Sequence, residues 1–399
     1  MGKTMTYNES RRRFLRTSGV ALLGVTLHPR AFPGMVPPGP KRQLSFYAGT
    51  YTDAGGKGIY RYHAGGEDGG AVLKPVGTDI KNPSFITFDR HRRFLYAVCE
   101  TDEYDGRATG GVYAYAVDPI TGSLQLINHR SSGGAGPCHL SLDHTDRFLF
   151  VANYTGGSVA AFPLRDDGGI APESDFVQHH GSGPVKDRQQ SAHAHCVGLD
   201  LSNRYVMVAD LGMDRVMIYS FDSTRGTLVP AAQPFLLLPP GSGPRHFVFH
   251  PDGDKMYIIA ELNSTVTAAA YDREKGVLRI IGSQSTLPAG YSGENAGAEV
   301  CVAPSGRFVY CSNRGHNSIA VFAVHPDTGA LDLVQHQSTG VHWPRNFAID
   351  PSGQYLLVAN QRSDSVVLFL IDEKEGTLSP GDLSIEIPSP VCVQIVPPR

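Results

Sequence analysis

The stretch FVFHPDGDKMYIIAELNSTVTAAAYD, residues 247–272, contains three short apolar segments separated by two turns. A Pro-Asp-Gly turn follows the first segment, and an Asn-Ser turn follows the second. Short apolar segments with alternating side chains are typical of β-strands, and Gly, Pro, Asn and Asp are favoured in turns. The stretch therefore predicts three consecutive antiparallel strands.

This pattern recurs along the chain at intervals of 47 to 57 residues, close to the repeat length of propeller blades, which is about 40–50 residues. The third segment of most copies leads into a glycine turn. The copies align on the residue that ends the first segment, which we call the anchor: Asp89, Asp143, Asp200, His250, Ala303 and Asp350. The glycines that follow the third segments are Gly122, Gly226, Gly276, Gly329 and Gly376.

The two ends of the chain supply one further copy. Residues 46–49 and 59–62 match a second and a third strand, and residues 391–396 provide the missing first strand. We predict an all-β, seven-bladed β-propeller in which the N- and C-terminal strands pair and close the ring. Closure removes most exposed strand edges. A single domain is expected over residues 41–399.

The composition agrees with this architecture and excludes one class of function. The chain has 399 residues, with 45 Gly and 28 Pro for the many turns. Its net charge of −3 lacks the basic surplus of a nucleic-acid-binding protein. The six cysteines are scattered, and we interpret them as small buried thiols. No glycine-rich phosphate loop is present, and no cofactor is predicted.

Residues 1–40 are predicted to be an export segment. Arg11, Arg12 and Arg13 precede a short apolar stretch at residues 20–25, and a Pro-rich linker follows at residues 33–40. A twin arginine before a weak apolar stretch is typical of a Tat signal. The stretch is too short to span a membrane, so no stable span is expected after processing. We expect a monomer that is exported by the Tat machinery to the periplasm or beyond.

Chemically active residues gather in two columns of the repeat: the pair that opens each first strand and the pair that ends each second strand. In an antiparallel blade these positions lie at the same end, so they surround one mouth of the channel. The side chains that a repeat framework does not require are His195, Arg245, Glu261 and Arg314. We predict a ligand site there. The alternative is a ring of salt bridges between blades.

Five further residues of these columns are predicted to contact the ligand or shape the site: His139, His246, Glu299, Asn153 and Arg345. Asn153 shares its column with Asn313 and Asn360, for which a turn role is the alternative. His193 and His195 lie two residues apart and would form half of a metal site, but no third ligand is evident. We predict no metal.

Several motifs resemble the lactonase family of seven-bladed β-propellers, which is typified by bacterial 6-phosphogluconolactonases and includes a fungal carboxy-muconate cyclase. The resemblance implies metal-independent lactone chemistry and assigns His195, Arg245, Glu261 and Arg314 to positions facing the substrate. Ala260 is a departure, because relatives commonly have Asn there. The motifs are YAGTY (47–51), NYTGGSV (153–159), SAHAH (191–195), GPRHF (243–247), EL (261–262), SNRGHNSI (312–319), WPRNF (343–347) and VANQ (358–361).

We therefore predict hydrolysis of a sugar-acid lactone. His195 or Glu261 would activate water, and Arg245 and Arg314 would stabilise the oxyanion and hold an anionic group. Because 6-phosphogluconolactone is made in the cytosol, export favours an unphosphorylated aldonolactone. Two alternatives stay open: a cyclase that forms a lactone from an unsaturated diacid, and a non-catalytic binding or scaffold propeller.

Overall fold

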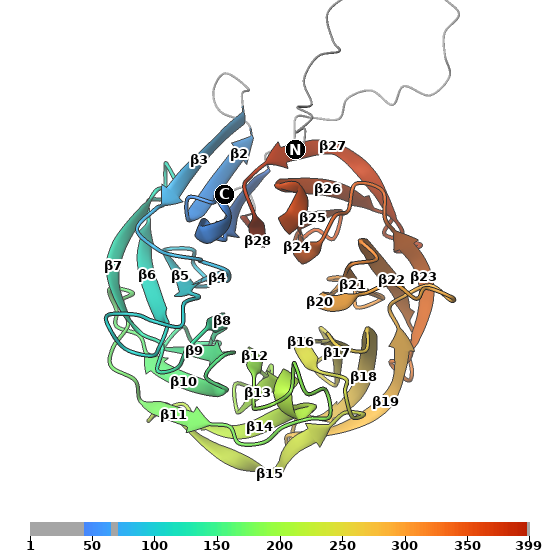
Figure 1. The fold of residues 1–399 in the computed structure, drawn as a ribbon, viewed down its shortest axis with the longest axis horizontal. Coiled ribbons are helices and arrows are strands. Elements are labelled where there is room, and N and C mark those ends of the chain that lie inside the picture. The colour runs from blue at the N-terminus through green and yellow to red at the C-terminus, as the bar shows by residue number, and fades with distance from the viewer. Residues whose placement is uncertain (1–43, 65–70, 397–399) are drawn as a thin grey trace, which may run out of the picture. The chain divides into compact units, whose positions relative to one another are not determined.

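The computed structural model describes residues 44–64 and 71–396, and this part of the chain forms seven four-stranded antiparallel sheets arranged in a ring (Figure 1). The prediction of a seven-bladed β-propeller is confirmed. The proposed export segment lies outside the described residues. From the centre outward, the blades are β28 (Pro390–Val396), β1 (Ser45–Thr50), β2 (Ile59–Ala64) and β3 (Ala71–Gly77); β4 (Ile86–Phe88), β5 (Phe94–Cys99), β6 (Gly111–Val117) and β7 (Leu124–Ser131); β8 (Pro137–Leu142), β9 (Phe148–Asn153), β10 (Ser158–Pro163) and β11 (Asp175–Gln178); β12 (Ala194–Leu199), β13 (Tyr205–Asp210), β14 (Arg215–Asp222) and β15 (Thr227–Leu237); β16 (Pro244–Phe249), β17 (Lys255–Ala260), β18 (Thr265–Asp272) and β19 (Val277–Ser285); β20 (Ala296–Val302), β21 (Phe308–Arg314), β22 (Ser318–Val324) and β23 (Leu331–Gln337); β24 (Pro344–Ile349), β25 (Tyr355–Asn360), β26 (Ser365–Ile371) and β27 (Leu378–Glu386).

The ring closes as the sequence predicted. The C-terminal strand β28 pairs antiparallel with β1, with Phe46 opposite Ile395 and Ala48 opposite Val393. One blade therefore joins the two ends of the described chain. Three short 3-10 helices follow strands at one end of the blades: η1 (Thr52–Ala54), η2 (Leu211–Met213) and η3 (Gln361–Ser363).

The core lies between neighbouring blades, where the faces of adjacent sheets pack against each other. Phe148 and Phe150 of β9, for example, contact the edge of Phe221 of β14 at centroid distances of 5.3 and 5.0 Å. Aromatic pairs in this geometry add to the stabilisation from burial. Within residues 44–64 and 71–396, no helix is long and apolar enough to cross a membrane.

The anchor aspartates stabilise the turn between the first two strands of a blade. Asp143 is 1% exposed, and its Oδ1 accepts hydrogen bonds from the backbone N–H groups of Arg147 at 2.6 Å and Phe148 at 2.8 Å. Its Oδ2 accepts from Thr145 N and from Asn203 of the next blade, both at 3.0 Å. The repeated Asp thus joins two strands and, in this blade, two sheets.

Replacing Asp143 with Ala is expected to lower the free energy of unfolding by about 2–3 kcal/mol, because buried backbone donors lose their acceptor. Urea denaturation measures this loss. The control is Asp118→Ala. Asp118 also accepts a hydrogen bond from a turn N–H, that of Thr121, but its carboxylate is exposed to water. Equal effects of the two substitutions would contradict the role assigned to the anchor.

Candidate active site

A β-bulge opens most of the innermost strands and directs side chains toward the mouth of the channel. In β8, β12, β16 and β24 the pairing register shifts around the second residue of the strand, and β20 shifts near Ala298 and Glu299. Bulges bend a strand and re-aim its side chains, often beside active sites. Simple two-residue alternation, which we expected for these strands, is interrupted there. The bulged residues of the first four strands are Cys138, His195, Arg245 and Arg345.

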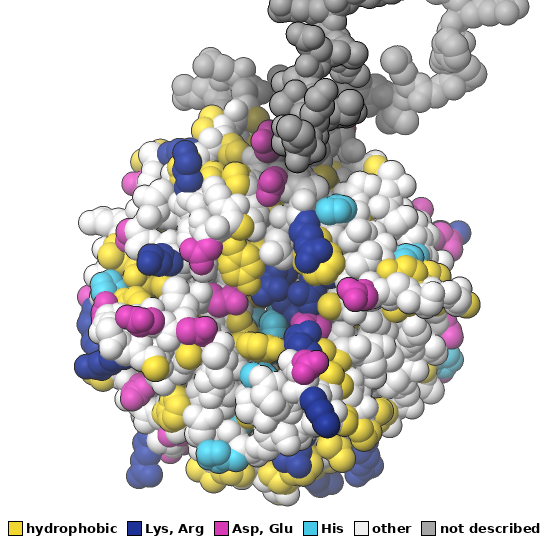
Figure 2. Space-filling model, in the orientation of Figure 1, with side chains coloured by type: hydrophobic (Ala, Val, Ile, Leu, Met, Phe, Trp, Pro, Cys, Tyr) yellow, Lys and Arg dark blue, Asp and Glu magenta, His cyan; other side chains and the backbone are white. Residues whose placement is uncertain are grey.

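The mouth contains a cavity of about 680 Å³, within the usual range for small-molecule sites. Figure 2 shows the hollow at the centre of the ring, with Lys or Arg, Asp or Glu, and His side chains in and around it. Four of the nine residues predicted from the sequence line this cavity: His195, Glu261, Arg314 and Arg345.

Glu261 is held by three arginines. Its Oε1 accepts a hydrogen bond from Arg188 Nη2 at 2.5 Å, and its Oε2 accepts one from Arg314 Nη2 at 2.7 Å. Arg245 Nε lies 3.1 Å from the same Oε2, in an ion pair without hydrogen-bond geometry. Burial alone would raise the pKa of Glu261, but Arg314, Arg245 and Arg188 hold it well below its ordinary value. An ionised carboxylate so strongly paired is a weak base.

His195 has the opposite environment. It is 5% exposed, and its Nδ1 is buried with no hydrogen-bond partner in the described part of the chain. Burial lowers the pKa of His195 well below its usual 6.5, and Arg245 and the ring of His246 lower it further. The imidazole is therefore neutral at physiological pH and retains a lone pair. Of the two bases suggested by the sequence, His195 is the one that forms no ion pair within the described part of the chain.

Arg345 provides a cation that no carboxylate neutralises directly. Its guanidinium lies 5.3 Å from the centre of the Tyr51 ring and forms no hydrogen bond or ion pair with a described residue. The Tyr51 hydroxyl donates to Glu100 at 3.1 Å. Burial would lower the pKa of Arg345, but Tyr51 and Glu100 outweigh that effect and raise it, so the side chain stays charged.

The other predicted residues do not line the cavity. Arg245 lies behind Glu261 and donates from Nη1 to the carbonyl of Ala298 at 2.6 Å. His139, His246 and Glu299 are all less than a tenth exposed and lie beside the lining residues rather than among them. Their place on the innermost strands is as expected; direct exposure to the cavity is not found.

The surroundings of Asn153 agree with the alternative stated for its column, a structural role beside a turn. Asn153 is fully buried, and its Nδ2 donates to the Ser132 carbonyl and to Ser158 Oγ, both at 3.1 Å. Asn313 and Asn360 repeat this arrangement in their own blades, each with a main-chain carbonyl and the Ser that opens the third strand. The Asn column therefore ties second strands to third strands, away from the cavity.

Sequence reasoning missed Arg188, which lies between β11 and β12 in an insert without a counterpart in the other copies. It reaches Glu261 and also donates to the Tyr154 hydroxyl at 3.3 Å. The same insert holds His179, which is buried between Asp210 at 2.7 Å and Tyr219 at 2.9 Å. The other lining residues that were not selected are Tyr51, Glu100, Cys138, Tyr154, Glu294, Asn295, Ala296, Gly315, Trp343 and Arg362.

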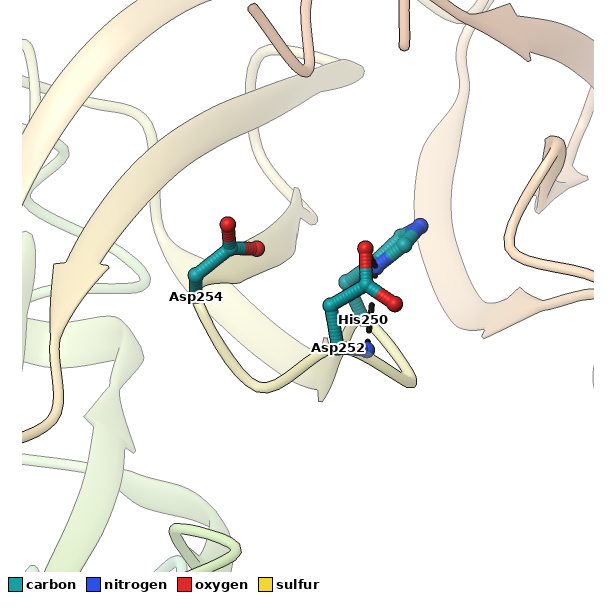
Figure 3. A group of neighbouring side chains, drawn as sticks. All are labelled: His250, Asp252 and Asp254. Carbon is teal, nitrogen blue, oxygen red and sulfur yellow. Dashed lines mark hydrogen bonds and ion pairs between the residues drawn. The ribbon is translucent and has the colours of Figure 1, made fainter. Parts of the chain in front are cut away.

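One turn brings together His250, Asp252 and Asp254, three potential metal ligands (Figure 3). His250 Nε2 lies 3.0 Å from the Gly306 carbonyl, to which it must donate, and Nδ1 accepts the Asp252 N–H at 3.2 Å. Asp254 pairs with Lys255 at 2.8 Å. Both nitrogens of His250 are thus used at an anchor position, and we assign this group to turn stabilisation.

The fold and the cavity define a class of protein: a seven-bladed β-propeller with an arginine-rich, ligand-sized cavity at one mouth of its channel. The sequence profile described as "Lactonase, 7-bladed beta-propeller" matches residues 45–395. The chain belongs to this lactonase family.

Two relatives and one solved structure show the extent of the similarity. The 6-phosphogluconolactonase of Bacillus subtilis is 35% identical over 350 residues, covering 88% of this chain and 97% of that protein. The 6-phosphogluconolactonase of Formosa agariphila is 36% identical over 309 residues, covering 76% and 86%. The structure titled as a periplasmic gluconolactonase of Pseudomonas aeruginosa has a TM-score of 0.82 at 35% identity, covering 89% of this chain and 99% of that one.

Proposed function

We propose that the protein hydrolyses a sugar-acid lactone in this cavity by metal-independent attack of water. The observation that carries the proposal is the pairing of a neutral, unbonded His195 with a cavity wall of arginines. A neutral imidazole accepts a proton from water, and guanidinium groups stabilise the charge that develops on the carbonyl oxygen. The names of the two lactonase relatives and of the gluconolactonase structure support this chemistry.

The reaction has two proton transfers. His195 takes a proton as the water oxygen bonds to the lactone carbonyl carbon, and the carbonyl electron pair moves to oxygen. The tetrahedral intermediate then collapses, the ring C–O bond breaks, and His195 returns the proton to the departing oxygen. Arg314 faces the developing oxyanion, while Glu261 holds Arg314 in place and is not the base.

Arg345 selects an anionic group of the substrate or product. Of the lining cations, Arg345 and Arg362 have no direct carboxylate partner among the described residues, and Arg362 is exposed to water. Arg345 is the less exposed of the two, so a ligand anion would compensate its desolvation. A carboxylate or a phosphate fits this role. Relatives named 6-phosphogluconolactonase favour a phosphorylated lactone, and the gluconolactonase structure together with the predicted export segment favours an unphosphorylated one.

Replacing Arg345 with Met is expected to raise KM for an anionic lactone about 10–100-fold, because the charge pair is lost in a desolvated site. A neutral lactone would lose less, and Arg345→Lys would recover part of the affinity. Initial rates over a range of substrate concentrations give the comparison. Equal losses for charged and neutral lactones would contradict anion recognition by this residue.

The dependence of kcat on pH follows from the lowered pKa of His195. Protonation removes the base, so a lowered pKa moves the loss of activity toward acid. We expect the loss of kcat that belongs to His195 to lie below about pH 6.5. A pH–rate profile, corrected for spontaneous hydrolysis, measures this. Burial raises the pKa of Glu299 to about 7, so only an inflection at or above pH 6.5 that remains in Glu299→Gln would assign the base elsewhere. The charged or titratable groups around His195 are Arg245, Arg314, Arg345, His246, Glu261 and Tyr154.

A product screen tests the proposed function against the cyclase alternative. Phosphorylated and unphosphorylated aldonolactones and muconate-type diacids are each incubated with the protein, and products are identified by NMR. We expect ring opening of an aldonolactone and no change in the diacids. Lactone formation from a diacid, without aldonolactone hydrolysis, would support a cyclase instead.

A further inference from the structure

Three buried side chains lead from the interior of the ring to the cavity wall. Glu299 Oε1 lies 2.9 Å from His246 Nδ1, and the His246 ring packs against the His195 ring at a centroid distance of 5.1 Å. All three residues are less than a tenth exposed, and of the three only His195 lines the cavity. The group therefore connects a buried carboxylate to the proposed base.

The hydrogen bonds of Glu299 determine the tautomer of His246. Besides His246, its carboxylate accepts from Val300 N at 3.0 Å and from Asn346 Nδ2. An ionised carboxylate can only accept, so its contact with His246 requires a proton on His246 Nδ1 whenever Glu299 is ionised. Burial raises the pKa of Glu299 to about 7, so this ionised form prevails above neutral pH. His246 then carries its proton on Nδ1, and its Nε2 has a lone pair.

Among the described residues, two imidazole nitrogens are buried and have no hydrogen-bond partner: His246 Nε2 and His195 Nδ1. They belong to rings in contact, and a neutral imidazole has one N–H group and one lone pair. The lone pair of His246 Nε2 is complementary to a proton on His195 Nδ1. Catalytic hydrogen bonds are often long without substrate and shorten when it binds.

We propose that Glu299 and His246 are positioning residues that hold the proton of His195 on Nδ1 and leave its Nε2 lone pair for the attacking water. This inference rests on the lactonase function proposed above. When His195 Nε2 takes a proton from water, the His195 imidazolium donates a hydrogen bond from Nδ1 to His246 Nε2. The proton on His195 Nε2 later passes to the ring oxygen as the C–O bond breaks. Glu299 keeps its charge throughout.

The surrounding charges show why this support matters. The cations near the two histidines oppose a new positive charge on His195, so the imidazolium that forms during the reaction needs a negative charge behind it. Glu261 is already paired with three arginines, whereas Glu299 is hydrogen-bonded into the histidine chain. The charged or titratable groups that face His246 or His195 are Arg245, Arg314, Arg345, Glu261, Glu299, His139, Tyr154 and Cys196.

Glu299→Gln tests the kinetic part of the proposal, because Gln keeps the size and can still accept from His246. We expect kcat to fall about 10–100-fold, with KM changed less than about twofold and the acid limb of kcat moved to lower pH. His246→Gln should show the same pattern. The control is Asp350→Asn, another buried carboxylate. Asp350 directly follows the innermost strand β24, at the end away from its bulge, and accepts from Tyr355 N of β25. Wild-type kcat and pH profile in Glu299→Gln would overturn the proposal.

Nitrogen-15 NMR of histidine-labelled protein tests the tautomers without any substrate. The wild type should show His195 and His246 each protonated on Nδ1, and Glu299→Gln should change the His195 signals while Asp350→Asn does not. A proton on His195 Nε2, or His195 signals unaffected by Glu299→Gln, would overturn the proposal. A wild type that opens no lactone but shows the expected tautomers would refute the proposed function alone and support the positioning role.

Discussion

Replacing His195 with Gln is expected to lower kcat about 10²–10⁴-fold, the usual contribution of a general base. Gln has a similar size and polarity, but its amide does not accept a proton at neutral pH. The surroundings should keep their structure, because His195 Nδ1 has no hydrogen-bond partner to lose among the described residues. Steady-state rates and thermal unfolding, measured together, separate the chemical effect from a structural one.

His180→Gln is the matched control for this substitution. His180 is exposed and lies in the insert before β12, so its loss should leave both kcat and stability unchanged. If His195→Gln keeps more than about a tenth of wild-type kcat, the base is another group. A large fall in kcat in both variants would point to a general effect of losing a histidine rather than to His195.

Glu261→Gln is expected to lower the free energy of unfolding by about 3–5 kcal/mol, because removal of one partner leaves buried charges uncompensated. Arg245 and Arg314 are only 2% and 6% exposed, so water replaces the carboxylate for them only in part. Urea denaturation gives the change. Inorganic phosphate should restore part of the lost stability if it binds the unpaired arginines.

Glu274→Gln provides the comparison, since Glu274 forms an exposed ion pair with Arg204 at 3.3 Å. Exposed pairs contribute little, and we expect almost no change in the midpoint of unfolding. If Glu261→Gln were equally mild, the three arginines would not depend on this carboxylate. The assignment of Glu261 as their organiser, rather than as the base, would then have to be withdrawn.

The repeat made the fold predictable from sequence. Each copy carries its own turn residues and apolar strands, so the spacing of the anchors was enough to give the blades. The pairing of residues 391–396 with β1 followed from the one strand that the seventh copy lacked. These features are local or periodic, and a single sequence displays them.

The site was predictable only to the level of the columns. His195 and Arg345 line the cavity, but Arg245, at the equivalent bulge of β16, does not. Its guanidinium instead pairs with Glu261 and donates to the Ala298 carbonyl. No spacing rule signals a bulge in advance, although a Pro precedes it in β8, β16 and β24. Arg188 lies in a unique insert, where a repeat gives no guidance.

The enzyme-dependent rate of lactone opening tests the central claim most directly. The initial rate of proton release is measured in a pH-stat with 6-phosphogluconolactone and with glucono-lactone, with and without the protein. We expect a rate that is proportional to protein concentration, saturates with at least one of the two lactones and is lost in His195→Gln. Folded wild-type protein that leaves both lactones at their spontaneous rates would contradict a lactonase site in this cavity.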